Sequence, residues 1–290
     1  MAGDLAPAAA TPQSGEFDLS DADFERLREL IYLHAGISLG AGKRQMVYSR
    51  LIRRLRILGL KDFRDYLLLI EADEGGERQA FTNALTTNLT AFFREPHHFP
   101  ILSEYAKRAE RDHLTIWSSA CSTGEEAYSI AITMAEAFGS IPAPVRILAS
   151  DVDTNVLERA RFGVYPMERA AKVPADQIRN YFLRGSGAHE GMVKVRPELR
   201  EMISFRQINL LDADWGVRGP LDVIFCRNVM IYFNKKTQYE ILKRFAAVLA
   251  PNGLLFIGHS ESLHHASDLF RLRGKTVYQL LTANEVTGNA

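Results

Sequence analysis

The sequence predicts an α/β fold: an open, mostly parallel sheet, preceded by a small all-α domain and interrupted by an inserted small β-subdomain. Up to about residue 110, apolar residues recur at helical spacing and no strand pattern interrupts them. From His113 onward, short apolar runs alternate with amphipathic stretches, which is typical of a parallel sheet with helices on both faces. Between Gly163 and Ser204 this alternation stops, and helix, turn and one or two short strands are expected there.

The N-terminal pattern predicts four helices in series. The first begins at a Ser/Asp cap and ends at Gly36, and the set is expected over residues 20–36, 42–60, 61–73 and 77–88. The predicted organisation is a disordered Ala/Pro/Ser-rich leader at 1–16, a helical domain at 17–95, a sheet domain at 96–284 with an insertion at about 163–204, and a tail at 285–290.

The alternating region predicts the strands and helices of one sheet. Strands are expected over residues 114–120, 145–153, 203–212, 221–228, 254–260 and 276–281, and helices over 125–138, 154–162 and 235–250. Ligands of such sheets bind beyond the carboxyl ends of the strands.

Composition excludes several classes of protein. Lys+Arg and Asp+Glu both number 35, so no global charge favours nucleic acid or a membrane surface. Cys121 and Cys226 form no CxxC pair, which favours a reducing compartment without disulfides or structural zinc. The adjacent histidines at 97–98 and 264–265 lack further ligands, so they are expected at the surface or at helix ends, and no metal is predicted. With no signal peptide pattern and no apolar run near ~20 residues, a cytoplasmic monomer without membrane insertion is expected.

The first strand–helix junction, WSSACSTGEEAYS at 117–129, is rich in small residues. Its backbone can approach a ligand, although a tight structural turn explains the composition equally well. The chain has no GxGxxG and no GxxxxGK[ST] pattern, and Glu125 and Glu126 at the helix start would compete with a phosphate. A ligand without phosphate is favoured.

Two further strand ends indicate which ligand this is. Asp151 is placed to take both hydroxyls of a ribose, unless it caps the next helix, for which Asp153 is at least as good a candidate. After the third strand, Asn209 could hydrogen-bond an adenine ring while Leu210 covers it, unless Asn209 simply ends the strand. A small-residue turn, a strand-end acid and no phosphate site together predict S-adenosylmethionine.

The fourth strand ends in CRNVMIYF, 226–233, without the [DNS]PP[YFW] stretch common in methyltransferases of exocyclic amines. A carboxylate acceptor is more than ~99% ionised at pH 7 and needs alignment rather than a general base. Arg94 and Tyr232 suit that task. Arg94 could instead hold the cofactor's carboxylate or form an interface salt bridge, and Tyr232 could be a core residue. Phe92 and Phe93 are expected to bury where the two domains join.

The chain resembles the CheR-type chemotaxis receptor methyltransferases in the stretches TTNLTAFFREPHHF (86–99), SSACSTGEEAYSIA (118–131), ASDVDTNVLERA (149–160), INLLD (208–212) and FCRNVMIYF (225–233). The resemblance covers residues 17 to 282. It implies methyl transfer from S-adenosylmethionine to glutamates on chemoreceptor signalling helices, with Arg94 and Tyr232 beside the reacting methyl. It also implies cofactor contacts from Asn88, Thr90, Arg94, Glu125, Asp151, Asn209, Leu210, Arg227 and Asn228.

Members of this family meet the acidic receptor with a basic helix of the N-terminal domain. Residues 43–56, KRQMVYSRLIRRLR, contain six bases and no acid. Val47, Leu51, Leu55 and Leu58 can face the core, which leaves Arg50, Arg53 and Arg54 outward to bind the receptor, or only as a solvated face. Some members also bind a receptor tether peptide through the insertion, for which 163–204 carries no matching motif. The alternatives are a nucleic-acid methyltransferase and a non-catalytic, cofactor-sensing scaffold.

Overall fold

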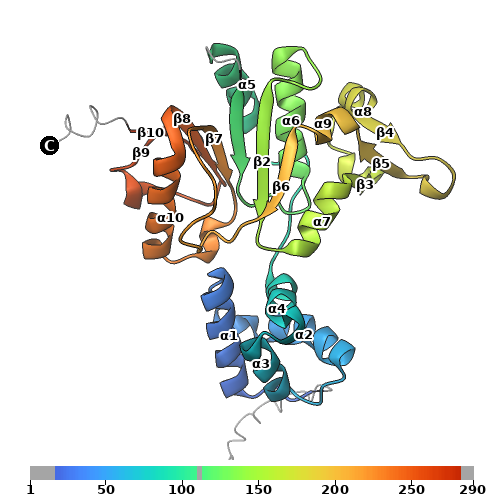
Figure 1. Ribbon diagram of the computed structural model, residues 1–290, viewed down its shortest axis with the longest axis vertical. Coiled ribbons are helices and arrows are strands. Elements are labelled where there is room, and N and C mark those ends of the chain that lie inside the picture. The colour runs from blue at the N-terminus through green and yellow to red at the C-terminus, as the bar shows by residue number, and fades with distance from the viewer. Residues whose placement is uncertain (1–16, 110–112, 282–290) are drawn as a thin grey trace, which may run out of the picture. The chain divides into compact units, whose positions relative to one another are not determined.

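The computed structural model describes residues 17–109 and 113–281, so the predicted leader and tail lie outside the described residues. Contacts between Cα atoms divide the chain into two units (Figure 1). The helical unit contains residues up to Ile31 and Leu39–Leu85, and the sheet unit contains Tyr32–Ser38 and the chain from Thr86 onward. No helix among the described residues is both long enough and apolar enough to cross a membrane.

The four helices predicted at the N-terminus are confirmed. They are α1 (Asp21–Ala35), α2 (Arg44–Leu58), α3 (Phe63–Ala72) and α4 (Glu77–Leu85), with short 3-10 turns η1 (Ala41–Lys43) and η2 (Glu74–Gly76). Asp62 caps α3 by accepting from the Asp65 N–H, and Gly59 ends α2 in the left-handed conformation at φ 66°. The apolar faces of these helices form the core of the helical unit, which includes Leu27, Leu51 and Phe81, all fully buried.

The sheet unit is built on seven strands in the order β6-β2-β1-β7-β8-β10-β9. The first five are parallel to their neighbours, and the hairpin at the end of the chain adds β10 and β9 antiparallel, which confirms a mostly parallel sheet. The strands are β1 (Leu114–Ser118), β2 (Val145–Asp151), β6 (Ile203–Gln207), β7 (Leu221–Cys226), β8 (Leu249–Ile257), β9 (Phe270–Gly274) and β10 (Val277–Leu280). The helices are α5 (His98–Arg108), α6 (Glu125–Phe138), α7 (Thr154–Phe162) and α10 (Lys235–Val248), with 3-10 turns η5 (Met230–Tyr232) and η6 (His264–Ala266).

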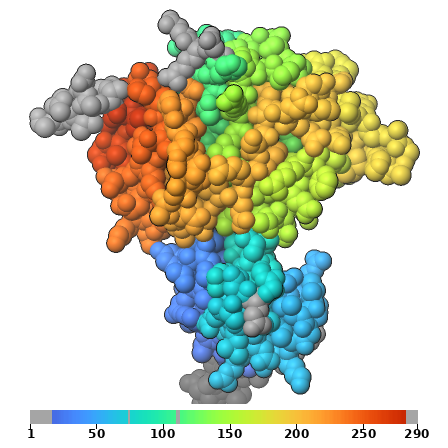
Figure 2. Space-filling model, viewed as in Figure 1, coloured from blue at the N-terminus to red at the C-terminus, as the bar shows by residue number. Residues whose placement is uncertain are grey.

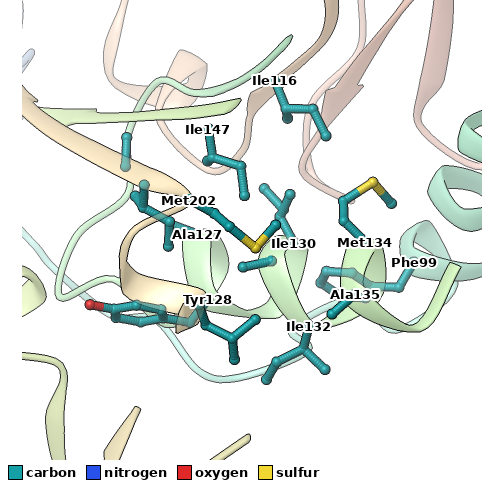
Figure 3. Close-up of a cluster of buried hydrophobic side chains, with 14 of the residues drawn as sticks. Phe99, Ile116, Ala127, Tyr128, Ile130, Ile132, Met134, Ala135, Ile147 and Met202 are labelled. Carbon is teal, nitrogen blue, oxygen red and sulfur yellow. The ribbon is translucent and has the colours of Figure 1, made fainter. Parts of the chain in front are cut away.

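Alternate residues of the central strands enter two separate cores. On β1, Ile116 packs into the cluster that contains α5 and α6, whereas Trp117 packs into the cluster that contains α10. Figure 3 shows Ile116 and Ile147, from neighbouring strands, beside Ile130 and Met134 of α6. Because both faces are covered, the central strands are mostly apolar, although β2 contains the exposed Arg146 and β7 contains the buried Asp222.

The insertion forms a three-stranded antiparallel sheet in the order β3-β5-β4, one strand more than the most the sequence predicted. It contains β3 (Val164–Pro166), η3 (Met167–Ala170), α8 (Ala175–Tyr181), β4 (Phe182–Arg184), η4 (Gly187–His189), β5 (Met192–Val195) and α9 (Pro197–Arg200). Figures 1 and 2 show it, in yellow, as a lobe at the side of the main sheet opposite β9 and β10. The third strand escaped prediction because β3 has three residues only and pairs with β5, which lies more than 20 residues away in sequence.

The segment 86–96 folds with the sheet unit. Phe92 is buried against Tyr165 and Phe182 of the insertion, at ring-centroid distances of 5.0 and 5.5 Å, and Phe93 packs against Phe99 of α5 at 5.0 Å. The rings that were expected at the join between the domains thus have their recognised partners inside the sheet unit. They fasten the segment to its own unit.

Candidate active site

The carboxyl ends of four parallel strands meet at one edge of the sheet. Ser118 at the end of β1 lies beside Ala149 of β2 and Phe225 of β7, and Phe225 lies beside Phe256 of β8. The segments that follow these strands, 119–124, 151–153, 227–229 and 258–261, must therefore lie next to one another. This edge is where ligands of open α/β sheets bind.

The small-residue turn after β1 is held tightly by backbone bonds. The Ser119 N–H donates to the Phe225 carbonyl at 2.9 Å, and the Cys121 N–H donates to the Ser150 carbonyl at 2.8 Å. Gly124 has φ 98°, and a Cβ there would lie 2.9 Å from the Tyr165 hydroxyl. Cys121 and Cys226 are fully buried free thiols, and burial raises the pKa of each.

Asp151 lies at the end of β2 with 8% of its surface exposed. One carboxylate oxygen accepts from the Ser122 N–H at 2.8 Å, and the other accepts from the Asp153 N–H at 3.0 Å. The helix-cap alternative for Asp151 is wrong, because Asp153 caps α7 by accepting from the Asn155 N–H at 2.9 Å. Each Asp151 oxygen keeps a further lone pair for a ligand donor.

Glu125 is fully buried at the start of α6. It accepts from the Thr123 hydroxyl at 2.6 Å and forms an ion pair with Arg169, which comes from η3 in the insertion. Tyr165 of the insertion donates to the Thr123 carbonyl at 2.7 Å. The insertion is therefore bonded to the small-residue turn. Sequence reasoning missed Arg169 because nothing in 163–204 indicated which of its bases reaches this edge.

The segment 86–96 is fastened to the end of β2. The Asn88 amide donates to Asp153 at 2.7 Å, and the Ser122 hydroxyl donates to the Asn88 carbonyl at 3.0 Å. Thr90 and Arg94 follow, both half-buried, and the Arg94 guanidinium donates to the Leu89 carbonyl at 2.7 Å. Asn88 therefore lies beside the Asp151 turn.

Arg227, directly after β7, is buried among protein groups. It donates to Glu126 at 3.1 Å, bonds the Arg94 carbonyl, and lies 3.6 Å from the Glu95 carboxylate. Burial raises the pKa of Glu126, while the Arg227 charge acts in the opposite direction. In this structure the Arg227 side chain ties the segment 86–96 to the sheet edge.

Asn209, which was expected to hydrogen-bond an adenine ring, bonds to protein groups in this structure. The Asn209 amide donates to the His34 carbonyl at 2.6 Å and its oxygen accepts from the Leu211 N–H at 3.0 Å. Leu210 is buried. The Asn209 side chain therefore holds the 32–38 segment of the sheet unit, which no local sequence pattern could show.

The two remaining predicted site residues follow β7. Asn228 has φ 58°, a left-handed backbone conformation, and its N–H donates to Glu261 at 2.9 Å. Tyr232 is half-buried in η5, and its carbonyl accepts from the Ser38 N–H at 3.2 Å. Neither lies in the hydrophobic core, so the core alternative for Tyr232 is not what the structure shows.

One of the four paired histidines lies at a helix end, as expected, but it is buried. His98 at the start of α5 is fully buried, its Nε2 lies 2.9 Å from the Thr276 hydroxyl, and burial lowers its pKa to about 4. Potential metal-ligand atoms of Glu95, His97 and His98 lie within 4.8 Å of one another. The Arg227 guanidinium, 3.6 Å from Glu95, opposes a cation there.

The basic helix α2 is only partly as expected. Val47, Leu51 and Leu55 are buried, but Leu58 is exposed. Among the three predicted receptor-binding arginines, Arg53 is exposed, whereas Arg50 donates to the Leu85 carbonyl at 2.9 Å and Arg54 pairs with the buried carboxylate of Glu77 at 2.9 Å. The prediction that all three point outward is wrong, because long side chains reach polar groups of neighbouring helices.

The fold and this edge together define an S-adenosylmethionine-dependent methyltransferase. The family model "CheR methyltransferase, SAM binding domain" matches residues 88–279, and "CheR methyltransferase, all-alpha domain" matches residues 22–86. The chain belongs to the CheR methyltransferase family.

Curated relatives match over nearly their whole length. Chemotaxis protein methyltransferase 2 of Pseudomonas aeruginosa is 56% identical over 91% of this chain and 94% of that relative. The chemotaxis protein methyltransferases of Klebsiella aerogenes and Escherichia coli are 54% and 55% identical, over 94% and 90% of this chain and 94% and 92% of theirs. The S-adenosylmethionine-binding domain that the sequence predicted is confirmed.

Proposed function

We propose that this methyltransferase transfers the methyl group of S-adenosylmethionine to side-chain carboxylates of glutamates on chemoreceptor signalling helices. The products are glutamate methyl esters and S-adenosylhomocysteine. The observation that carries the proposal is the 54–56% identity to three relatives named chemotaxis protein methyltransferases, over about nine tenths of each chain. The enzyme would act in the cytoplasm, recruited to membrane receptors.

The chemistry of the edge supports a carboxylate acceptor. A carboxylate oxygen attacks the methyl carbon, the C–S bond breaks, and the sulfonium becomes a neutral thioether, so no proton is removed. Because the transfer removes no proton, none of the buried carboxylates Glu125, Glu126 and Asp151 is needed as a general base, and all three accept hydrogen bonds from protein groups instead. In this proposal Arg94 and Tyr232 align the acceptor, and the enzyme supplies closeness and exclusion of water.

The direct test uses labelled S-adenosylmethionine, the purified protein and membranes that bear chemoreceptors, followed by alkali. Carboxyl methyl esters are hydrolysed by alkali and release volatile methanol, whereas N-methyl groups stay. Alkali-labile label on receptor protein is the expected result. Alkali-stable label on RNA or DNA would contradict the proposal, and cofactor binding without any methylated product would show a sensor scaffold.

We propose that Asp151 binds the ribose hydroxyls, which makes cofactor affinity depend on pH. Burial raises the pKa of Asp151 from 3.8 to about 6. The folded protein therefore holds this proton more tightly than the unfolded chain, and the contribution of Asp151 to stability falls as pH rises through that window. Only the ionised form can accept both hydroxyls, so affinity for S-adenosylhomocysteine should fall below pH 6, about tenfold by pH 5.

Calorimetric titrations between pH 5 and pH 8 would measure this dependence. The control is Asp151→Asn, which should bind weakly and show no step near pH 6. A wild-type affinity that stays constant across the range would remove Asp151 from the ribose site.

We propose that α2 docks the acidic receptor mainly through Arg53, the exposed member of the three predicted arginines. Arg53→Glu should lower receptor methylation severalfold through KM, because each exposed ion pair contributes ~0.2–1 kcal/mol and the reversal adds repulsion. The affinity for S-adenosylhomocysteine should stay unchanged. Raising the salt concentration should reduce the difference between wild type and variant. Equal losses of receptor methylation and cofactor binding would contradict a docking role.

A further inference from the structure

Glu261 lies in the turn 258–261 that follows β8, at the same sheet edge as the candidate active site. Its side chain has 9% of its surface exposed. One carboxylate oxygen, Oε2, accepts from two backbone N–H groups, that of Asn228 at 2.9 Å and that of Gly258 at 2.5 Å. A buried carboxylate that accepts two backbone donors is a strong, charge-assisted anchor.

The backbone that Glu261 holds is in an unfavourable conformation. Asn228 has φ 58°, which costs energy for a residue with a side chain. Gly258 leaves room for this arrangement, because a Cβ there would lie 2.3 Å from the side-chain nitrogen Nδ2 of Asn228 and 2.8 Å from Glu261 Oε2. The loop after β7 therefore depends on the turn after β8 for its shape.

The same turn also holds the other active-site segment. His259 donates its backbone N–H to Glu95 at 3.1 Å, and its ring nitrogen Nδ1 lies 2.9 Å from the same carboxylate oxygen. Glu95 follows Arg94 directly in the segment 86–96. The turn 258–261 therefore hydrogen-bonds both the segment 86–96 and the loop 227–229, although it contains none of the predicted site residues itself.

We propose that Glu261 is a positioning residue for methyl transfer, which holds the loop 227–229 in the conformation that presents Asn228 to the cofactor. The inference rests on the proposed function and on the cofactor contact by Asn228 that the family resemblance implies. The second carboxylate oxygen of Glu261, Oε1, is buried and accepts no hydrogen bond from the described residues. Only one oxygen of the side chain carries the anchoring role, so a side chain with one well-placed acceptor should perform it.

The test compares three substitutions of Glu261 in the full chain. Glu261→Gln keeps an acceptor at the same reach, Glu261→Asp keeps the charge but withdraws it by one methylene, and Glu261→Ala removes it. Affinity for S-adenosylhomocysteine, measured by calorimetry, should stay within about threefold for Gln and fall about tenfold for Asp and further for Ala. Ser262→Ala, at an exposed neighbouring position, is the matched control and should bind as wild type does.

A merely structural role would not produce this order. If the side chain served only to stabilise the fold, affinity for S-adenosylhomocysteine in the folded variants would be unchanged, and that result would overturn the proposal. If Glu261→Gln lost as much affinity for S-adenosylhomocysteine as Glu261→Asp, that result would overturn the proposal as well. Because the readout is product binding, the result does not depend on whether glutamate is the acceptor, and failure of the receptor assay alone would count against the proposed function only.

Discussion

Arg94→Ala should lower the proposed methyl transfer to receptor glutamates by about 10²–10³-fold while leaving the fold intact. Removing one group that stabilises or aligns charge in a transition state typically costs this much. Arg94 is half-buried, and within residues 17–109 and 113–281 its guanidinium donates only to the Leu89 carbonyl, so little packing is lost with it. Initial rates of alkali-labile methylation, beside circular dichroism spectra of both proteins, would measure the effect.

The control for this substitution is Arg94→Lys, which keeps the charge without the planar fork. If Arg94 aligns a carboxylate through two N–H groups, the lysine variant should recover only a small part of the rate. Calorimetry with S-adenosylhomocysteine then separates two roles. Lost product binding would assign Arg94 to the cofactor's carboxylate, and retained binding would assign it to the acceptor. Full activity of the alanine variant would remove Arg94 from the site.

Arg54→Ala should destabilise the helical unit by about 3 kcal/mol, the lower end of what breaking a buried ion pair costs. Glu77 has 4% of its surface exposed and accepts two bonds from Arg54 and one from the Tyr66 hydroxyl at 2.8 Å. Without Arg54, the buried Glu77 carboxylate keeps only the hydrogen bond from the neutral Tyr66 hydroxyl. For a unit of this size the midpoint temperature of thermal unfolding should fall by roughly 12–24 °C. Calorimetry of the full chain would measure this change.

Arg53→Ala is the matched control, one residue earlier on the exposed side of α2, and should change the unfolding free energy by less than about 0.5 kcal/mol. The double variant Arg54→Ala/Glu77→Gln should recover part of the loss, because it leaves no buried charge without a partner. An Arg54→Ala protein that melts as wild type does would show that water reaches Glu77 and replaces the guanidinium.

The elements of this fold are largely predictable because their signals are local. Gly36, the small-residue turn before α6 and the Asp153 cap each fix a boundary through the backbone conformation or bond that they supply. The apolar strands β1 and β7 show in sequence because both of their faces are buried. Strand β3, with three residues, and the packing of Phe92 on the insertion depend on contacts between distant segments, which periodicity does not contain.

The positions of candidate site residues are predictable where strand ends mark them, and not where side chains bond across elements. The position of Asp151 at the end of β2 is predictable from the sequence, and its role at the ribose stays a proposal. Arg169, Glu95 and Glu261 were missed, because each acts on a residue far away in sequence. One signal was present for Glu261: the polar turn IGHSE follows a buried parallel strand next to β7, so it had to reach the same edge. Arg54 was predicted to face solvent, but it pairs with the buried Glu77. The spacing of charges along a helix does not show whether a base faces solvent or a buried carboxylate of another helix.

The two cysteines have a practical consequence. Both thiols are fully buried beside the sheet edge, and burial holds each pKa above its usual range, so neither offers an exposed thiolate to an alkylating reagent. The helical unit contains no cysteine at all. The rate of thiol alkylation in the unaltered chain therefore records how often the sheet unit opens, separately from any melting of the helical unit.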